Sequence, residues 1–187
     1  MIIESLTKAL HQYNLEIGTN TYEDIFALYD SDEYFARVSN NFPVKMETII
    51  EDVDTIPPFT TAEKKHYISI YNDEKELVAV IDFIEGYSYK NMHGENAIWI
   101  GLLQIDKRKQ HLGLGKSIIN ALFESCKENH KEFIQIGVIK ENERALKFWT
   151  KQGFDSFTEV NNGDFDLVLM EKHLDGDFIS KSIYNCK

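Results

Sequence analysis

Two nearly continuous apolar segments, ELVAVIDFI (76–84) and AIWIGLLQI (97–105), constrain the fold of this chain more than any other feature. A strand exposed on one face alternates apolar and polar residues, so runs of this kind predict strands buried on both faces. The segment KKHYISIY (64–71) does alternate, and we expect it to form a neighbouring strand. Three further strands are expected at residues 133–139, 154–160 and 165–172, of which the last two form a hairpin around NNGD.

Apolar residues at helical spacing lie before and between these strands. TYEDIFALYDSDEYFARVSN predicts a helix capped by Thr21 and a second, shorter helix at Tyr34–Val38. VKMETIIEDVDT predicts the next helix, which the prolines of IPPF end. We expect these to be the first helices of the chain. Two more helices are expected, one after QHLGLG and one at Asn142–Gly153. The pattern indicates a mixed α/β domain at residues 1–172 and a weakly periodic tail at 173–187.

The length of 187 residues is about that of one domain. The longest uncharged apolar run covers about ten residues, whereas a membrane-spanning helix needs roughly 20. The N-terminal segment MIIESLTKALHQ mixes charged residues into its start and does not resemble a signal peptide. We therefore expect a cytoplasmic protein that does not enter a membrane.

Acidic residues outnumber basic residues by 31 to 20, which gives a net charge of −11. This charge repels polyanions, so nucleic acid is not an expected partner, and it mildly favours a cationic small substrate. Two cysteines are too few for a disulfide framework or a four-ligand zinc site, and we predict no metal site. Cys126 is expected to be a small core residue and Cys186 a thiol of the tail.

The segment QHLGLG (110–115) lies between an apolar strand and an amphipathic helix, where backbone N–H groups can bind phosphate. A dinucleotide-binding fingerprint needs a third glycine, which is missing. A nucleotide-triphosphate loop is a stronger rival because GKS follows at 115–117. However, Gln110 stands where that loop has its first glycine, and the next strand ends in Lys140 without a metal-binding aspartate. The remaining interpretation is that exposed N–H groups at the start of the helix bind a pyrophosphate.

Two motifs in this half of the chain resemble those of the GNAT superfamily of N-acetyltransferases. IGLLQIDKRKQHLGLGKSIINAL is similar to its acetyl-CoA-binding segment, an apolar strand followed by Arg/Gln-x-x-Gly-x-Gly/Ala and a helix. About thirty residues later, NERALKFWTKQGF resembles the Asn-x-x-Ala-x-x-Phe-Tyr-x-x-x-Gly-Phe segment of the family. The resemblance covers roughly residues 64–172, and the early helices fit the family's variable acceptor-binding part. The matching positions are Gln110, Gly113, Gly115, Asn142, Ala145, Phe148, Gly153 and Phe154.

The resemblance implies a mixed, mostly antiparallel central sheet of about six to seven strands flanked by helices, with acetyl-CoA as co-substrate. The sheet would splay after its fourth strand, with the pantetheine arm along that strand and the pyrophosphate on the N–H groups of residues 111–116. Asn142 would touch the pantetheine, although a helix N-cap explains this residue equally well. The implied cofactor-binding residues are Leu103, Gln104, Ile105, Gln110, His111, Leu112, Gly113, Leu114, Gly115, Lys116, Asn142, Ala145, Phe148 and Trp149.

The catalytic groups are less clear from the sequence. Many relatives use the tyrosine of the Phe-Tyr pair as the acid, but this chain has Trp149, whose indole N–H cannot donate a proton at neutral pH. A thiol is a tolerable leaving group without a dedicated acid. Relatives often carry a glutamate on the fourth strand, which is absent here. Asp82, inside an apolar strand where burial would raise its pKa, is the first candidate base, and Glu85 is the second.

Each of these candidates has a structural alternative. The carboxylate of Asp82 could simply be satisfied by backbone N–H groups or by an indole. His93 and His111 lie in polar turns and are expected to be solvated. The aromatic residues of the early helices could line an acceptor pocket, but such a stripe is more often core; they are Tyr22, Phe26, Tyr29 and Tyr34.

The resemblance thus implies direct acetyl transfer to a primary amine of a small acceptor by a monomer or homodimer. The alternative of another class is a non-catalytic module on the same fold that senses acyl-CoA or binds a partner, and the missing tyrosine and glutamate favour it. The sequence does not name the acceptor.

Overall fold

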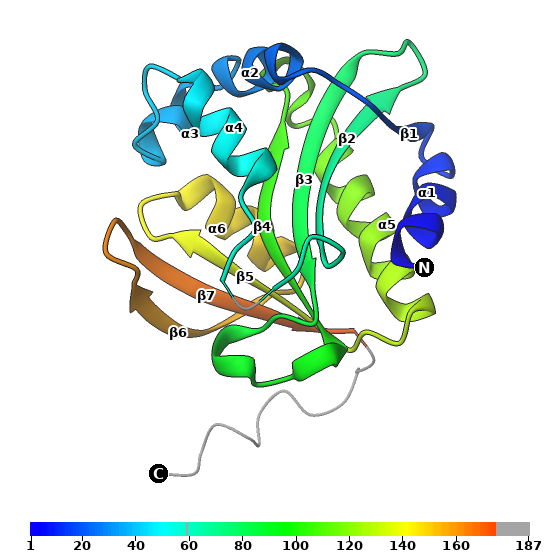
Figure 1. Ribbon diagram of the computed structural model, residues 1–187, viewed down its shortest axis with the longest axis vertical. Coiled ribbons are helices and arrows are strands. Elements are labelled where there is room, and N and C mark those ends of the chain that lie inside the picture. Colours follow the sequence, from blue (N-terminus) through cyan, green and yellow to red (C-terminus); the bar gives the residue numbers. More distant parts are fainter. Residues whose placement is uncertain (59, 175–187) are drawn as a thin grey trace.

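The computed structural model describes residues 1–58 and 60–174 of the chain, which form one twisted sheet covered by helices (Figure 1). The described strands have the order β1-β2-β3-β4-β5-β7-β6. Neighbouring strands are antiparallel except for β4 and β5, which are parallel. The strands are β1 (Leu15–Gly18), β2 (Lys65–Asn72), β3 (Leu77–Glu85), β4 (Ala97–Ile105), β5 (Phe133–Ile139), β6 (Asp155–Asn161) and β7 (Asp166–His173). The expected mixed, mostly antiparallel α/β sheet is therefore confirmed.

Helices pack on both faces of this sheet. The α-helices are α1 (Ile2–His11), α2 (Tyr22–Asp30), α3 (Glu33–Val38), α4 (Met46–Asp54), α5 (Leu114–Glu128) and α6 (Glu143–Lys151). Short 3-10 turns are η1 (Tyr89–Asn91), η2 (Gly94–Asn96) and η3 (Lys107–Lys109). Successive residues of β3 enter different cores: Ile81 packs with α1 and α5, and Val80 packs with α2 and α4. Figure 1 shows α1 and α5 together on one side of β2 and β3, and α2 to α4 grouped on the other.

The N-terminus corrects one sequence prediction. The helices after Thr21 are not the first, because α1 and the edge strand β1 precede them. In α1, apolar residues at helical spacing face the core, and Ile2 and Leu6 are both buried. The hydroxyl of Ser125 in α5 donates a 2.6 Å hydrogen bond to the carbonyl oxygen of Ile2. The segment MIIESLTKALHQ is thus a core helix that pairs with α5.

The C-terminal part of the domain ends close to the expected boundary. Strand β7 continues to His173, and Leu174 is buried in the core beside it. The boundary after residue 172 stays a prediction, and residues 175–187 with Cys186 lie outside the described residues. Cys126 is buried in the core as expected, and burial raises the pKa of its thiol to about 12. Within residues 1–58 and 60–174, the helices are all too short or too polar to span a membrane.

The sheet opens between β4 and β5. β4 and β5 are paired at Ala97–Ile100 and Phe133–Ile136, and beyond these residues the second half of β4 pairs with β3 but not with β5. At the same point Gly101 forms a bulge, because Asp82 of β3 pairs with Leu102 and the next residue, Phe83, pairs with Ile100. Only the first half of β4 is therefore buried as the apolar run predicts, and its second half borders the cavities described below.

Candidate active site

A cavity of about 200 Å³ lies where β4 and β5 separate. Its walls come from β4, from the QHLGLG turn and from the start of α6, three segments that are far apart in the sequence. Nine of the fourteen residues that the sequence assigns to cofactor binding line it: Leu103, Gln104, Ile105, Gln110, His111, Gly115, Asn142, Ala145 and Phe148. The structure thus brings the two sequence motifs to one cavity.

The QHLGLG turn leads directly into α5. Gly113 has a φ of +86°, a left-handed conformation that favours glycine, and a Cβ atom there would meet no atom within 4 Å. A Cβ atom on Gly115 would instead lie 3.2 Å from the ring of Phe148. Helix α5 begins at Leu114, so the N–H groups of its first turn have no partner within the helix and point toward its N-terminal end. The open turn and the free donors fit a pyrophosphate.

Four of the remaining assigned residues belong to this turn without lining the cavity: Leu112, Gly113, Leu114 and Lys116. Trp149 differs from them, since it is 4 % exposed and packs in the core. Its ring lies 5.0 Å from the rings of both Phe148 and Phe154 in edge-on arrangements. The structure therefore places Phe148 at the cavity and Trp149 behind it.

Asn142 caps α6. Its side-chain oxygen accepts a hydrogen bond of 3.1 Å from the backbone N–H of Ala145, and the residue also lines the cavity. The cap is therefore present, and the same side chain remains close to any ligand in the cavity.

The junction between α2 and α3 forms the outer wall of the cavity. Asp32, which is 6 % exposed, accepts a 2.7 Å hydrogen bond from Nε2 of Gln110. On the other side of the cavity, the guanidinium of Arg144 stacks 3.7 Å over the ring of Tyr34. These contacts join the early helices to the turn and to α6, so the acceptor-side helices help to enclose the predicted cofactor cavity.

Gln104 is the unexpected polar residue of this cavity. Its side chain is 3 % exposed, and its buried Nε2 finds no hydrogen-bond partner among the described residues. A buried amide without a partner is costly, so such a group commonly serves a ligand. The sequence included Gln104 only as part of the strand, not for its side chain.

A second cavity of about 230 Å³ lies on the α2–α4 face of the sheet. Phe35 and the middle of β4 are shared by the two cavities, since Leu102 lines this one and the adjacent Leu103 lines the first. Asp82 lines the second cavity together with Tyr29, Asp52, Tyr67 and Gly101. The predicted base and the predicted cofactor site are thus neighbours across β4.

Asp82 is half-buried, and among the described residues its carboxylate accepts no hydrogen bond; its Oδ1 is buried without a partner there. Burial raises the pKa of its carboxyl to about 6, with Asp52 adding to the rise and Lys65 opposing it. The alternative in which backbone N–H groups or an indole satisfy this carboxylate is not what the structure contains. An unpartnered carboxylate in a cavity with a pKa near neutrality can accept a proton.

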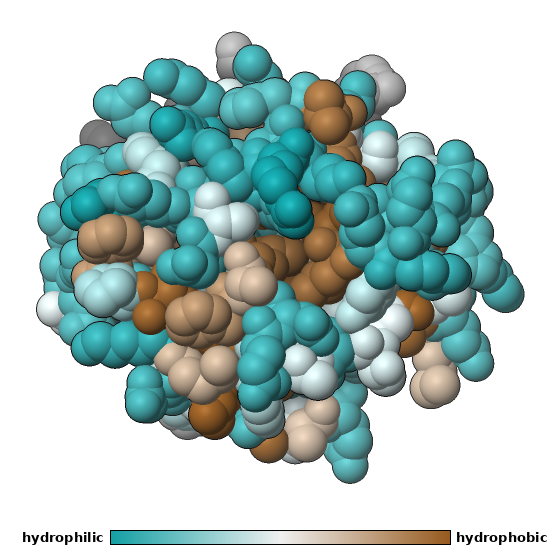
Figure 2. All heavy atoms as spheres, turned by 90° about the horizontal axis from the view of Figure 1, so that it is seen from above, coloured by the Kyte–Doolittle hydropathy of each residue, from teal (hydrophilic) through white to brown (hydrophobic). Residues whose placement is uncertain are grey.

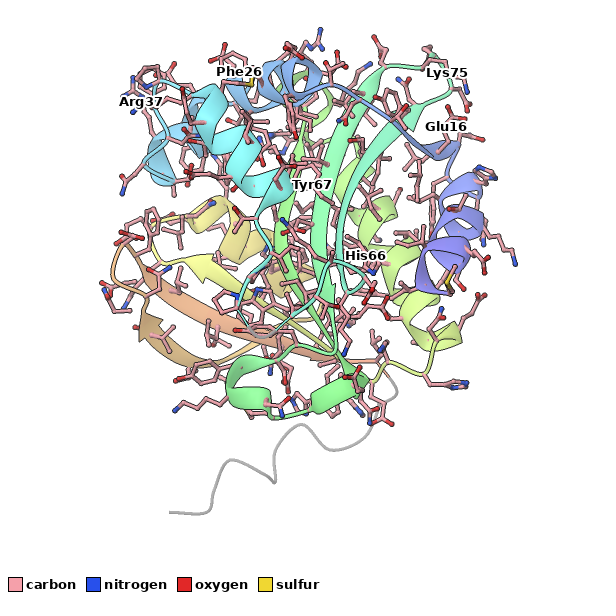
Figure 3. All side chains as sticks on the ribbon, in the orientation of Figure 1. Glu16, Phe26, Arg37, His66, Tyr67 and Lys75 are labelled. Carbon is pink, nitrogen blue, oxygen red and sulfur yellow. The ribbon has the colours of Figure 1, made fainter. Side chains whose placement is uncertain are left out.

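Glu85 lies on the other face of β3. Its carboxylate contacts Nε2 of His66 at 2.9 Å and Nζ of Lys131 at 3.5 Å. In Figure 3, His66 lies further down β2 toward α5, whereas Tyr67 lies beside α4. Because side chains alternate along a strand, Glu85 and Asp82 are not brought together.

The second cavity contains functional groups that the sequence did not reveal. Tyr29 donates a 2.9 Å hydrogen bond to Oδ2 of Asp52, and the hydroxyl groups of Tyr29 and Tyr67 lie 3.1 Å apart. Burial raises the pKa of both phenols above their usual range, so both are neutral at physiological pH. Of these residues only Tyr29 had a sequence signal, since Asp52 is one of several acids in its helix.

The other aromatic residues of the early helices have different surroundings. Tyr34 lines the first cavity, and Phe26 packs against the α2–α4 core. Tyr22 is 37 % exposed, and its hydroxyl contacts the carboxylate of Asp54 at 2.8 Å. The aromatic stripe is therefore divided between cavity, core and surface.

The expectation for the two histidines is half correct. His111 is exposed, but His93 is not solvated. The ring of His93 stacks on Phe133 with centroids 3.7 Å apart, and its Nε2 lies 2.6 Å from Oε2 of Glu171. This pairing with β5 and β7 anchors the turn before β4 at the end of the sheet away from both cavities. The turn sequence contains no sign of these distant partners.

The face of the molecule seen from above the view of Figure 1 is hollowed. Figure 2 shows apolar side chains in a depression near the centre of this face, surrounded by a mostly hydrophilic rim. An apolar recess with few polar groups is typical of small-molecule sites.

Comparisons with known proteins show the family and the fold. Residues 22–154 match a sequence profile described as the Acetyltransferase (GNAT) family. An acetyltransferase structure from Thermus thermophilus is 18% identical, with a TM-score of 0.66 over 86% of this chain and 97% of that one. A GNAT-family acetyltransferase from Staphylococcus aureus is 19% identical, with a TM-score of 0.58 over 86% and 99%. The ribosomal-protein-S18-alanine N-acetyltransferase of Escherichia coli is 14% identical, with a TM-score of 0.56 over 91% and 99%. At these identities the structural likenesses show the fold.

Proposed function

The chain belongs to the acetyltransferase (GNAT) family, and from this premise we propose that it transfers an acetyl group from acetyl-CoA to a primary amine of a small acceptor. The observation that carries the proposal is the junction of two cavities at β4. One is lined by the residues of both family motifs, and the other contains an unpartnered carboxylate. Co-substrate and acceptor can therefore meet beside Leu102 and Leu103.

The first cavity and its turn would hold acetyl-CoA, which supplies an activated acetyl thioester. The free N–H groups from His111 to Lys116 suit the pyrophosphate, and the backbone of Leu103 and Ile105 suits the pantetheine arm, because this part of β4 lacks a strand partner on the β5 side. The unpartnered amide of Gln104 would donate a hydrogen bond to the ligand.

Asp82 would act as the base. It receives a proton from the incoming ammonium, so that the nitrogen lone pair is free to attack the acetyl carbon. As the C–N bond forms and the C–S bond breaks, the electron pair of the C–S bond stays on sulfur, and the second proton of the nitrogen neutralises the thiolate. Trp149 supplies no proton, since its indole is not acidic and packs in the core. Glu85 would be a structural partner of His66 and Lys131.

The test is release of free thiol from acetyl-CoA with a panel of small primary amines. The expected result is amine-dependent thiol release that is lost in Asp82→Asn, while acetyl-CoA still raises the melting temperature of the variant. Binding of acetyl-CoA without thiol release for any amine would instead support the acyl-CoA-sensing alternative. That alternative draws on two observations, the absence of an acidic group at the position of Trp149 and the absence of a glutamate on β4.

A further inference from the structure

The cavity beside Asp82 has an unusual balance of charge. The ionisable groups that line it are the carboxylates of Asp52 and Asp82 and the phenols of Tyr29 and Tyr67. No lysine, arginine or histidine is among the described residues that line it. A carboxylate or phosphate on the acceptor would therefore lose its water without gaining a cationic partner, which is strongly unfavourable.

The cation that acts on both carboxylates is not available to a ligand. Lys65 lowers the pKa of both Asp52 and Asp82 through its charge, but it does not line the cavity. Its Nζ contacts the carbonyl oxygens of Asp52, Val53 and Thr55 at 2.6, 3.2 and 2.7 Å, at the C-terminal end of α4. An ammonium has three N–H donors, so these three contacts use all of them.

The phenol of Tyr67 is oriented so that its oxygen can accept a hydrogen bond from a ligand. The single proton of Tyr29 is directed to the carboxylate of Asp52, since a charged acceptor is preferred. In the 3.1 Å contact between the two phenols, Tyr67 is then the donor. The order Tyr67 to Tyr29 to Asp52 leaves lone pairs on the oxygen of Tyr67 for a donor from the ligand.

The size of the cavity limits the acceptor. Its volume of about 230 Å³ is below the roughly 300–1,000 Å³ of sites for drug-sized ligands. The wall opposite the sheet adds neutral polar groups, among them Asn41 and Thr48, which are already hydrogen-bonded to each other at 3.0 Å. A short chain with a hydrogen-bond donor at each end matches this shape and chemistry.

We propose that the acceptor is a short aliphatic diamine without a carboxylate, with its reacting amine at Asp82 and its second ammonium near Tyr67 and Asp52. This inference rests on the proposed acetyl transfer and narrows its acceptor. The reacting ammonium gives one proton to Asp82, the C–N bond forms while the C–S bond breaks, and the second nitrogen proton goes to the sulfur. The distal ammonium keeps its charge and its protons throughout.

Four probes with the same four-carbon chain test the inference: 1,4-diaminobutane, 4-amino-1-butanol, butylamine and 4-aminobutanoate. They differ only in the group at the distal end. Expected is a kcat/KM that falls in this order, with 1,4-diaminobutane at least tenfold above butylamine, or about 1.4 kcal/mol. 4-Aminobutanoate should be the poorest substrate. Equal or higher kcat/KM for 4-aminobutanoate would overturn the inference while leaving the proposed acetyl transfer intact.

A pair of variants assigns the distal contact. Asp52→Asn should remove most of the preference for 1,4-diaminobutane over 4-amino-1-butanol, because it removes the charge at the far end. Glu51→Gln makes the same change at the neighbouring, exposed position of α4 and should leave the preference unchanged. An unchanged preference in Asp52→Asn would contradict the assignment.

Binding provides a readout that does not depend on turnover. In the presence of CoA, 1,4-diaminobutane should raise the melting temperature of the wild type more than 4-aminobutanoate does. The difference between the two compounds should be smaller in Asp52→Asn. If the diamine binds in this way but no amine releases thiol, the proposed acetyl transfer fails and the charge selectivity of the cavity stands. If neither compound binds and the rates of thiol release with the two compounds are equal, the inferred preference of the cavity for a diamine is contradicted.

Discussion

Gly101 faces Asp82 across the β3–β4 pair, and a Cβ atom at position 101 would lie 2.6 Å from Oδ2 of that carboxylate. The bulge in β4 brings the glycine to this point, so the absence of a side chain leaves room for the carboxylate in the cavity. The conformation of Asp82 therefore depends on a residue of another strand.

Gly101→Ala should reduce turnover more than stability. The added methyl group must displace the carboxylate of Asp82, and a misplaced base commonly costs about a hundredfold in rate. We expect kcat to fall by at least tenfold, while the melting-temperature shift caused by acetyl-CoA stays normal because Gly101 does not line the cofactor cavity. A normal kcat would mean that the position of Asp82 is not critical.

Asp82→Asn should abolish most activity without destabilising the protein. The amide cannot accept a proton, so turnover should drop by roughly 10²–10⁴. In the wild type, kcat/KM should fall as the pH drops below about 6, where Asp82 becomes protonated. Asp73→Asn, at an exposed position of the β2–β3 turn, is the matched control and should behave as wild type.

The pH dependence of stability provides a separate check on Asp82. Its folded pKa of about 6 lies above its ordinary value of 3.8, so the folded state binds the proton more tightly. The free energy of unfolding of the wild type should then decline as the pH rises from about 4 to 6, by up to about 3 kcal/mol from this group. Asp82→Asn should lack this decline and be at least as stable at pH 7. A large loss of stability at pH 7 would favour a structural role instead.

Gly113→Val should block the phosphate-binding turn. Gly163→Val is a matched control, because both glycines have a positive φ, +86° and +104°, and a Cβ atom at either would meet nothing within 4 Å. Both variants should lose similar stability through backbone strain. Only Gly113→Val should lose the stabilisation by acetyl-CoA, which at 100 times its dissociation constant amounts to about 2.7 kcal/mol. Equal stabilisation of both variants would place the ligand elsewhere.

Gln104→Leu should separate ligand binding from folding. It removes a buried amide whose Nε2 has no partner among the described residues, so the ligand-free variant should be as stable as the wild type or more stable. If this amide donates to the ligand, the dissociation constant of acetyl-CoA should rise by roughly tenfold, the upper range for one neutral hydrogen bond. Gln12→Leu, at an exposed position, is the control. Unchanged affinity in Gln104→Leu would contradict the contact.

Much of the geometry of the proposed cofactor site could be predicted because it depends on local chemistry. The positive φ of Gly113, the helix that begins at Leu114 and the cap by Asn142 are each encoded within a few residues. A strand, a turn and a helix start in this order form an anion site whatever lies around them. The sequence also predicted the strands from β2 to β7, because their apolar residues are continuous or alternate, whereas the short edge strand β1 was missed.

The acceptor side could not be predicted in the same way. Nothing local distinguishes Asp52 from its neighbouring acids, or Tyr67 from the other residues of an alternating strand. The sequence ranked Asp82 before Glu85 but could not show their surroundings. In the structure Asp82 lines a cavity, and Glu85, on the other face of the sheet, pairs with His66 and Lys131. His93 was misjudged because its partners, Phe133 and Glu171, are 40 or more residues away.

The sequence by itself determined the α/β class, the order of strands β2 to β7 along the chain and the glycine turn before α5, because periodicity and turn chemistry act over a few residues. Only the tertiary structure decided which carboxylate is desolvated and unpartnered, which phenols are neutral and where two cavities meet. Burial and hydrogen-bond partners depend on strand register and on helices from distant parts of the chain, so the charge of the cavity beside Asp82 is a property of the fold.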